Sequence, residues 1–166
     1  DRGTGCERSV WRCACPVTRV QPARAAGHRT LYHDGVQRAL KAQNLEPLAV
    51  GLVERNSVDV AAAVAAIVPK MPDAVVQISA YKSCAAFIRA ARKAGYGGTF
   101  YNVSFVGTQA LSDELGKEAN GVMVSQVMPF PYSPATPLSG DYLAALKDKR
   151  GVAPNYSGIE GFVAAK

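Results

Sequence analysis

The stretch PDAVVQISAYKSCAAFIRAARKAGYGGTFYNVSFVG, residues 72–107, decides the fold. The apolar run at 74–79 predicts a buried strand, and the run at 99–105 predicts a second one. Between them, residues 85–95 have the amphipathic pattern of a helix, which ends in basic residues and Gly95. A strand, a helix and a strand of these lengths are typical of a right-handed crossover between parallel neighbours. The stretch therefore predicts an α/β layer.

The same alternation continues on both sides of this stretch. Further helices are predicted at 35–44, at 57–68 with Ser57 as the cap, and at 108–116, and further strands at 48–53 and 120–129. Strands that alternate with helices in this way form a parallel sheet with both faces covered. We therefore expect an α/β fold with a doubly wound parallel sheet.

A proline-rich segment, PFPYSPATPLSG at 129–140, ends this rhythm. Four prolines in twelve residues cannot form a helix or a central strand, so the segment is expected to be a connector. Two more helices are predicted after it, at 141–151 and 159–166.

The composition excludes several classes of protein. The hydrophobic content is 48% and the charged content 19%, and no apolar run is long enough to span a membrane. The net charge of +6 comes mainly from residues 1–33, which hold six Arg and two acidic residues. Because the rest of the chain is nearly balanced and has no basic stripe, neither nucleic-acid binding nor direct membrane insertion is expected.

Residues 1–33 differ from the rest of the chain. They lack Lys, show no periodicity, and contain most of the ligand-type side chains: Cys6, Cys13, Cys15, His28 and His33. The spacing of the Cys pair is too tight for a zinc finger, and no small core lies between Cys and His, so no metal site is expected. We predict that residues 1–33 are an unpatterned tail outside the fold, either disordered or a misannotated start.

Polar side chains follow each strand of the deciding stretch. Ser79, Ala80, Tyr81, Lys82 and Ser83 follow the first strand, and Asn102, Ser104, Phe105 and Thr108 follow the second. In an open parallel sheet, ligands bind at the carboxyl ends of the strands, where helix N-termini also favour anions. The pattern predicts a ligand site at this edge that includes Ser79, Ala80, Tyr81, Ser104 and Phe105.

Simpler interpretations of the same residues stay open. Ser79 and Ser83 could be helix caps, and Tyr81 could merely cover the edge of the sheet. Cys84 lies on an apolar helical face and is expected to be a core thiol.

Catalysis is not expected. No His follows His33, so no Ser-His-Asp or Cys-His arrangement can form in the patterned part of the chain, and no G-x-G-x-x-G or Walker loop occurs. An enzyme that used Tyr81 and Lys82 as a base pair would lack a positioned partner. We therefore predict a binding protein without a cofactor.

Taken together, three segments resemble the type I periplasmic binding proteins, specifically the branched-chain amino-acid (leucine/isoleucine/valine) receptors of ABC transporters. The segments are PDAVVQISAYKSCAAFIRAARKAG at 72–95, GVMVSQVMPFPYSPATPLSGDYLAALK at 121–147 and NYSGIEGFVAAK at 155–166. The resemblance implies one α/β ligand-binding lobe at 34–128. It also implies that residues 129–166 are a crossover and helices that belong to a missing first lobe.

The resemblance also implies a function. Tyr81 matches the tyrosine that the second lobe of these receptors contributes to the ligand. Ser104 stands where amino-acid binders of the family often carry a carboxylate, which leaves the recognition of an ammonium group open. The implied role is the solute-binding component of an ABC transporter, periplasmic in the intact protein, with an amino acid or similar small carboxylate as ligand and the transporter's membrane subunits as partners. The alternative is a ligand-sensing module of a receptor or regulator with the same fold.

Overall fold

A computed structural model describes residues 13–19, 26–54, 57–147, 149 and 151–166. Its centre is a sheet of five parallel strands in the order β2-β1-β3-β4-β5. The strands are β1 (Cys13–Arg19), β2 (Pro47–Glu54), β3 (Ala74–Gln77), β4 (Thr99–Asn102) and β5 (Val122–Val124). This order confirms the doubly wound parallel sheet, because the chain moves outward from β1 in one direction and then in the other.

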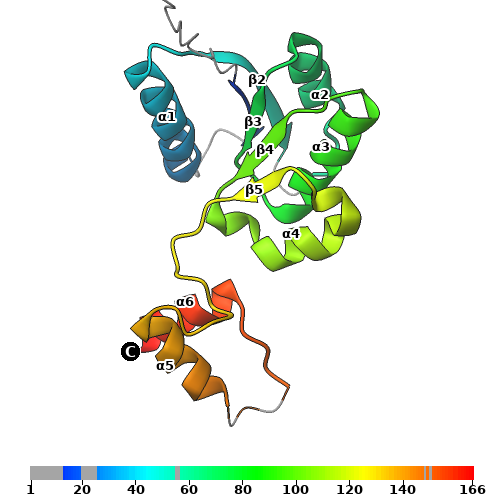
Figure 1. Cartoon of the computed structure of the whole chain (residues 1–166). Helices are drawn as coiled ribbons and strands as arrows, with labels where there is room; N and C mark the ends of the chain where they lie inside the picture. Colours follow the sequence, from blue (N-terminus) through cyan, green and yellow to red (C-terminus); the bar gives the residue numbers. More distant parts are fainter. Residues whose placement is uncertain (1–12, 20–25, 55–56, 148, 150) are drawn as a thin grey trace, which may run out of the picture.

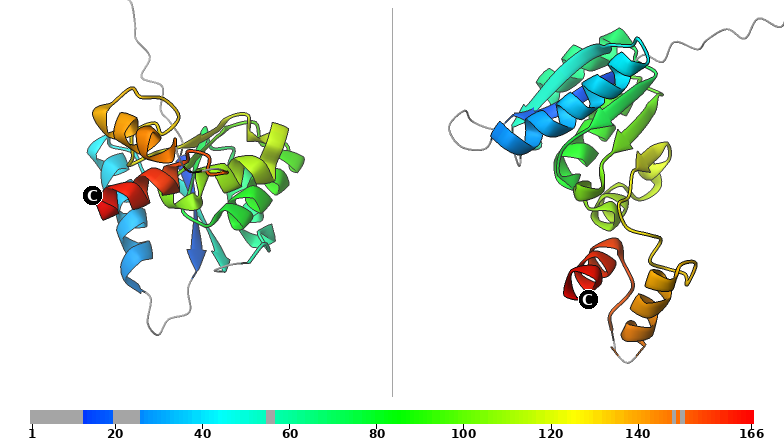
Figure 2. Two further views of the ribbon diagram at one scale, coloured as in Figure 1. Left: turned by 90° about the horizontal axis from the view of Figure 1, so that it is seen from below. Right: turned by 90° about the vertical axis from the view of Figure 1, so that its left-hand side faces the viewer.

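The helices lie on both faces of the sheet (Figure 1). The α-helices of the described residues are α1 (Ala26–Ala42), α2 (Ala61–Ile67), α3 (Tyr81–Lys93), α4 (Thr108–Leu115), α5 (Pro137–Leu146) and α6 (Tyr156–Ala165). In Figures 1 and 2, α1 covers one face and α2, α3 and α4 cover the other. Right-handed crossovers require this division when the strand order reverses at β1.

The main core lies between the sheet and the layer of α2, α3 and α4. Its largest fully buried side chains include Ile67 on α2, Phe87 and Ile88 on α3, and Phe100 on β4. The ring of Phe100 packs edge-on against Phe87, with 6.4 Å between the ring centroids. On the opposite face a small cluster joins Ile78 to Val36 of α1. Most of this core cluster thus comes from residues 57–100.

Residues 13–19 and 26–33 were interpreted wrongly from the sequence, while residues 20–25 lie outside the described residues. β1 pairs with β2 over its whole length and with the start of β3, so it occupies the middle of the sheet. α1 begins at Ala26 and runs across the expected boundary between residues 33 and 34. A short central parallel strand need not alternate between polar and apolar residues, so CACPVTR did not stand out. The expectations for Cys6 and for the rest of residues 1–12 lie outside the described residues.

The start of α2 also differs from the prediction. Ser57 does not cap the helix, which begins four residues later at Ala61. The Ser57 hydroxyl instead accepts a hydrogen bond from the Asp59 amide at 3.0 Å, and the Asp59 carboxylate accepts one from the Ala61 amide at 3.2 Å. Two successive side-chain turns therefore lead from β2 into α2.

The proline-rich segment leads from β5 to α5 and α6, which lie apart from the four sheet helices (Figure 1). This small unit has its own internal contacts. The Ser139 hydroxyl is fully buried and donates to the Phe130 carbonyl at 2.9 Å, and the side chain of Asn155 caps α6 by accepting from the Gly158 amide at 2.7 Å. The predicted connector and two helices are present, but α5 begins at Pro137, inside the predicted connector, because proline fits the first turn of a helix. The predicted domain boundary between residues 128 and 129 stays a prediction.

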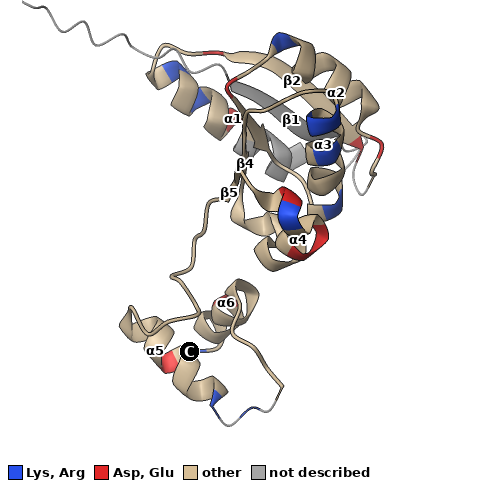
Figure 3. Cartoon of the chain, turned by 45° about the vertical axis from the view of Figure 1, so that its right-hand side comes forward, with Lys and Arg blue, Asp and Glu red and all other residues tan. Residues whose placement is uncertain are grey.

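Charged residues are distributed over several helices, and the acidic residues of α4 are followed by Lys117 and Glu118 in the 3-10 helix Gly116–Ala119 (Figure 3). Among the described residues, no helix has both the length and the apolar character that a membrane span requires.

Candidate functional site

The site predicted from the sequence lies at the carboxyl ends of two neighbouring strands. β3 and β4 pair in parallel, and their last residues, Gln77 and Asn102, are register partners. The chain then enters α3 through residues 78–80 and the short 3-10 helix at Ser104–Val106 through Val103. The five predicted residues therefore share one edge of the sheet.

The turn after β3 carries Ser79, Ala80 and Tyr81. Ala80 is the residue that caps α3 and is exposed, whereas Ser79 and Tyr81 are half-buried. The Tyr81 ring packs partly against the main core, and the Lys82 ammonium lies 6.0 Å from its centroid. Tyr81 thus has one side held by the protein and remains partly accessible at the edge.

The turn after β4 carries Ser104 and Phe105. Ser104 is half-buried and the Phe105 side chain is 49% exposed. Gly107 follows with φ of 82°, a left-handed conformation that favours glycine, and α4 begins at the next residue. Because that conformation turns the chain sharply, Ser104 and Phe105 stay at the edge of the sheet instead of continuing the strand.

Asn102 does not belong to this site. Its side chain is 3% exposed and faces the core side of the sheet, where its amide nitrogen donates to the Met123 carbonyl at 3.4 Å. Gln77 is buried on the same face. The prediction that Asn102 follows the strand was wrong, because residue 102 is the last residue of β4 and its side chain is buried.

The capping interpretation of the serines is also wrong. The N-cap residue of α3 is Ala80, and no side chain caps the helix. The Ser83 hydroxyl donates instead to the Ser57 carbonyl at 2.6 Å, in the loop between β2 and α2. The N-terminus of α3 therefore has no serine of its own on its first amides, an arrangement that suits a carboxylate ligand.

Cys84 is a buried core residue, as expected. It is 1% exposed and donates to the Ser79 carbonyl at 3.4 Å. Burial raises the pKa of the Cys84 thiol to about 12, and the hydrogen bond to Ser79 only partly opposes this effect. The thiol is therefore protonated and unreactive at neutral pH.

The described residues include no group of three or more metal-binding side chains.

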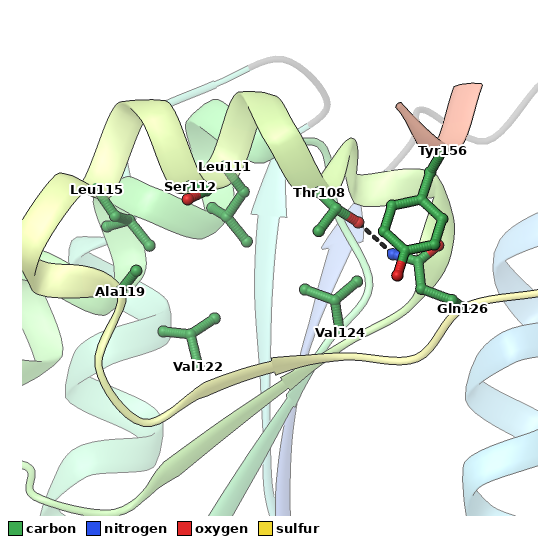
Figure 4. Close-up of a pocket in the computed structure, with 9 residues that line it drawn as sticks. All are labelled: Thr108, Leu111, Ser112, Leu115, Ala119, Val122, Val124, Gln126 and Tyr156. Atoms are coloured by element: carbon green, nitrogen blue, oxygen red, sulfur yellow. Dashed lines mark hydrogen bonds between the residues drawn. The ribbon is translucent and has the colours of Figure 1, made fainter. Parts of the chain in front are cut away.

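A groove of about 250 Å³ lies beside the predicted site, between α4 and the edge strand β5. Leu111, Leu115, Val122 and Val124 form its apolar walls (Figure 4). At one end the Gln126 amide donates to the Thr108 hydroxyl, beside the Tyr156 ring from α6.

None of the five predicted residues lines this groove. Sequence reasoning placed Thr108 near the ligand edge but missed Gln126 and Tyr156. No signal for Gln126 or Tyr156 was available, because their approach depends on how the proline-rich segment returns α6 to the sheet.

The doubly wound parallel sheet, with polar residues at the carboxyl ends of its strands, is typical of α/β ligand-binding proteins. The sequence profile of the family described as "Periplasmic binding protein" matches residues 20–166. The chain belongs to this family. The family consists of receptors and not of enzymes, which agrees with the expectation from the sequence.

Solved structures agree with this assignment. A "possible leucine/isoleucine/valine-binding protein" from Rhodopirellula baltica SH 1 is 26% identical with a TM-score of 0.75, over 92% of this chain and 41% of that one. A substrate-binding periplasmic protein from Ralstonia solanacearum is 25% identical with a TM-score of 0.74, and the match covers 95% of this chain and 44% of that one. An extracellular ligand-binding receptor from Verminephrobacter eiseniae shares the fold, with a TM-score of 0.72 and 22% identity. This match covers 94% of this chain and 44% of that one. No curated protein matches the chain significantly.

The chain spans less than half the length of these solved relatives. The fold is thus that of a type I periplasmic binding protein, present here as a fragment.

Proposed function

We propose that this chain is the ligand-binding lobe of the solute receptor of an ABC transporter, which acts in the periplasm and delivers its ligand to the transporter's membrane subunits. The observation that carries the proposal is the parallel pairing of β3 and β4, which brings Ser79, Tyr81 and Ser104 to one edge of the sheet. Membership of the periplasmic binding protein family supports it.

The chemistry of this edge favours a small carboxylate such as an amino acid. The N-terminus of α3 offers backbone N–H groups and the positive end of a helix dipole to the carboxylate. Tyr81 offers a ring and a hydroxyl, and the half-exposed Phe105 offers apolar contact to a side chain. The printed name of the Rhodopirellula baltica relative supports leucine, isoleucine and valine as the first ligands to test.

Because one lobe provides half of a cleft, we expect weak binding, with dissociation constants in the millimolar range. NMR chemical-shift titration detects binding of this strength. Addition of L-leucine should shift the amides of residues 79–83 and 104–107, and Tyr81→Phe should weaken the response. Tyr101→Phe is the matched control, since residue 101 lies on the opposite face of the sheet from the neighbouring Phe100.

Competition experiments with glycolate, which has a carboxylate but no ammonium group, and with methylammonium, which has an ammonium group but no carboxylate, test the two halves of the ligand separately. Competition by glycolate alone would show that the carboxylate carries recognition, in agreement with a serine at position 104. Shifts confined to the α4–β5 groove, or the absence of any shift at saturating leucine, isoleucine and valine, would contradict the proposal. The alternative of a ligand-sensing module uses the same edge, and a DNA-binding or membrane segment encoded in the same gene would favour it.

A further inference from the structure

Three buried or half-buried polar groups fix the turn that carries Tyr81. The Ser83 hydroxyl donates to the Ser57 carbonyl at 2.6 Å, and the Gln77 amide donates to the Cys84 carbonyl at 3.3 Å. The Cys84 thiol donates to the Ser79 carbonyl at 3.4 Å. Only the first of these bonds leaves the turn and reaches another part of the chain.

The bond from Ser83 joins two loops that the sheet holds apart. Ser57 follows β2 and Ser83 lies in the first turn of α3 after β3, and β1 separates these two strands in the sheet. The side chain of Ser83 is 3% exposed, so water competes little for its hydroxyl. The distance of 2.6 Å is at the short end for an O–H donor.

The loop that contains the acceptor, Ser57, is held by hydrogen bonds of its own. The Ser57 hydroxyl accepts from the Asp59 amide, and the Asp59 carboxylate accepts from the Ala61 amide at the start of α2. A continuous series of hydrogen bonds therefore runs from the first turn of α3 to the first turn of α2. The hydroxyl of Ser83 thus links the N-terminus of α3 to the loop that leads into α2.

We infer that Ser83 is a positioning residue for ligand binding, which holds the Tyr81 turn against the loop at 57–60. The inference rests on the proposed function of the edge. Ser83 makes no contact with ligand in this role. Its effect arises because the backbone of residues 79–83 can keep one conformation before the ligand arrives, which lowers the entropic cost of binding.

The test measures hydrogen–deuterium exchange and the binding of L-leucine in the variant Ser83→Ala. Without ligand, hydrogen–deuterium exchange should become faster in both segments, 57–62 and 79–84, and remain unchanged in α4. Ser157→Ala, an exposed serine of α6, is the matched control and should change neither segment. Faster exchange in only one segment, or in neither, would overturn the inference regardless of what the protein binds.

The binding arm uses L-leucine as the probe. Ser83→Ala should weaken its binding about three- to tenfold, the effect of one buried hydrogen bond. Phe100→Leu, a core change remote from the edge, should lower stability without changing the affinity, which separates positioning from a general loss of structure.

Affinity that falls equally in Phe100→Leu and Ser83→Ala would overturn the inference. If the unmodified chain does not respond to leucine, isoleucine or valine, the proposed function fails, while coupled exchange in the two segments would still show that Ser83 joins the two loops.

Discussion

The Arg89 guanidinium on α3 donates to the Glu114 carboxylate on α4 at 2.9 Å. The same guanidinium donates to the Glu118 carboxylate at 2.7 Å and to the Glu114 backbone carbonyl. These bonds raise the pKa of Arg89 above its usual value, and the bond to Glu118 has a larger effect than the bond to Glu114. Two adjacent helices are thus joined at the surface by one planar group, a geometry that lysine cannot reproduce.

We predict that Arg89→Met lowers the free energy of unfolding, and that the loss shrinks as salt increases because the pairs are exposed. Urea unfolding at low and high ionic strength measures both effects. Lys93→Met removes a cation from the same helix for which the described residues provide no ion pair, and it should have little effect. Equal losses in the two variants would show that the geometry of Arg89 contributes nothing.

The ring of Phe100 is fully buried between two other aromatic rings. Truncation by Phe100→Ala leaves a cavity that the packed helices cannot close, so we expect a loss of about 3–5 kcal/mol in the free energy of unfolding. The control is Tyr101→Ala, one residue later on the other face, where the side chain is 37% exposed. Urea denaturation should show a clearly smaller loss for the control, and comparable losses would mean that the core lies elsewhere.

Gly51 on β2 allows α2 to lie close to the sheet. A Cβ at this position would be 2.9 Å from the Ala63 Cβ and 3.0 Å from its Cα, too close for the backbones to stay in place. We expect Gly51→Ala to destabilise the protein by about 1–3 kcal/mol. Gly97→Ala, where no atom lies within 4 Å of the added Cβ, is the control and should be nearly neutral in thermal melting.

The patterned part of the chain was predictable because its periodicity is strong. The strands at 74–77 and 99–102 and the helix between them follow directly from apolar spacing, and the shared edge for Tyr81 and Ser104 follows from parallel pairing. β1 could not be predicted, since its seven residues show no alternation and their identity as a strand depends on two partners distant in sequence. The role of Ser83 was also hidden, because a hydroxyl near a helix start suggests a local cap while its partner lies 26 residues away.

Cys84 makes the free energy of unfolding depend on pH in the alkaline range. Burial raises the folded-state pKa of this thiol to about 12, against an ordinary value of 9.0. The unfolded chain therefore loses the Cys84 proton first, and stability should fall as pH rises from 9 towards 12, by up to about 1.4 kcal/mol per pH unit. Below pH 9 the full contribution of the neutral thiol remains.

Unfolding of the protein and of Cys84→Ala at several pH values from 8 to 11 tests this prediction. The stability difference between them should shrink or change sign as pH rises, and a constant difference would contradict it. Peptide-level mapping of alkylation adds a second readout, because Cys84 should be modified only after unfolding. Mapping by peptide is needed because the chain has four cysteines.

The central place of β1 has a consequence for how the chain assembles. Among the strands that the structure describes, β2 pairs only with β1, while β3, β4 and β5 add one after another on the other side. Ribosomal synthesis, which releases the N-terminus first, thus delivers the middle strand before its neighbours. Each later strand on that side meets an edge that already exists, so the sheet can grow outward in the order of translation. A clone trimmed to begin at Asp34 would lack the strand on which both sides of this growth depend.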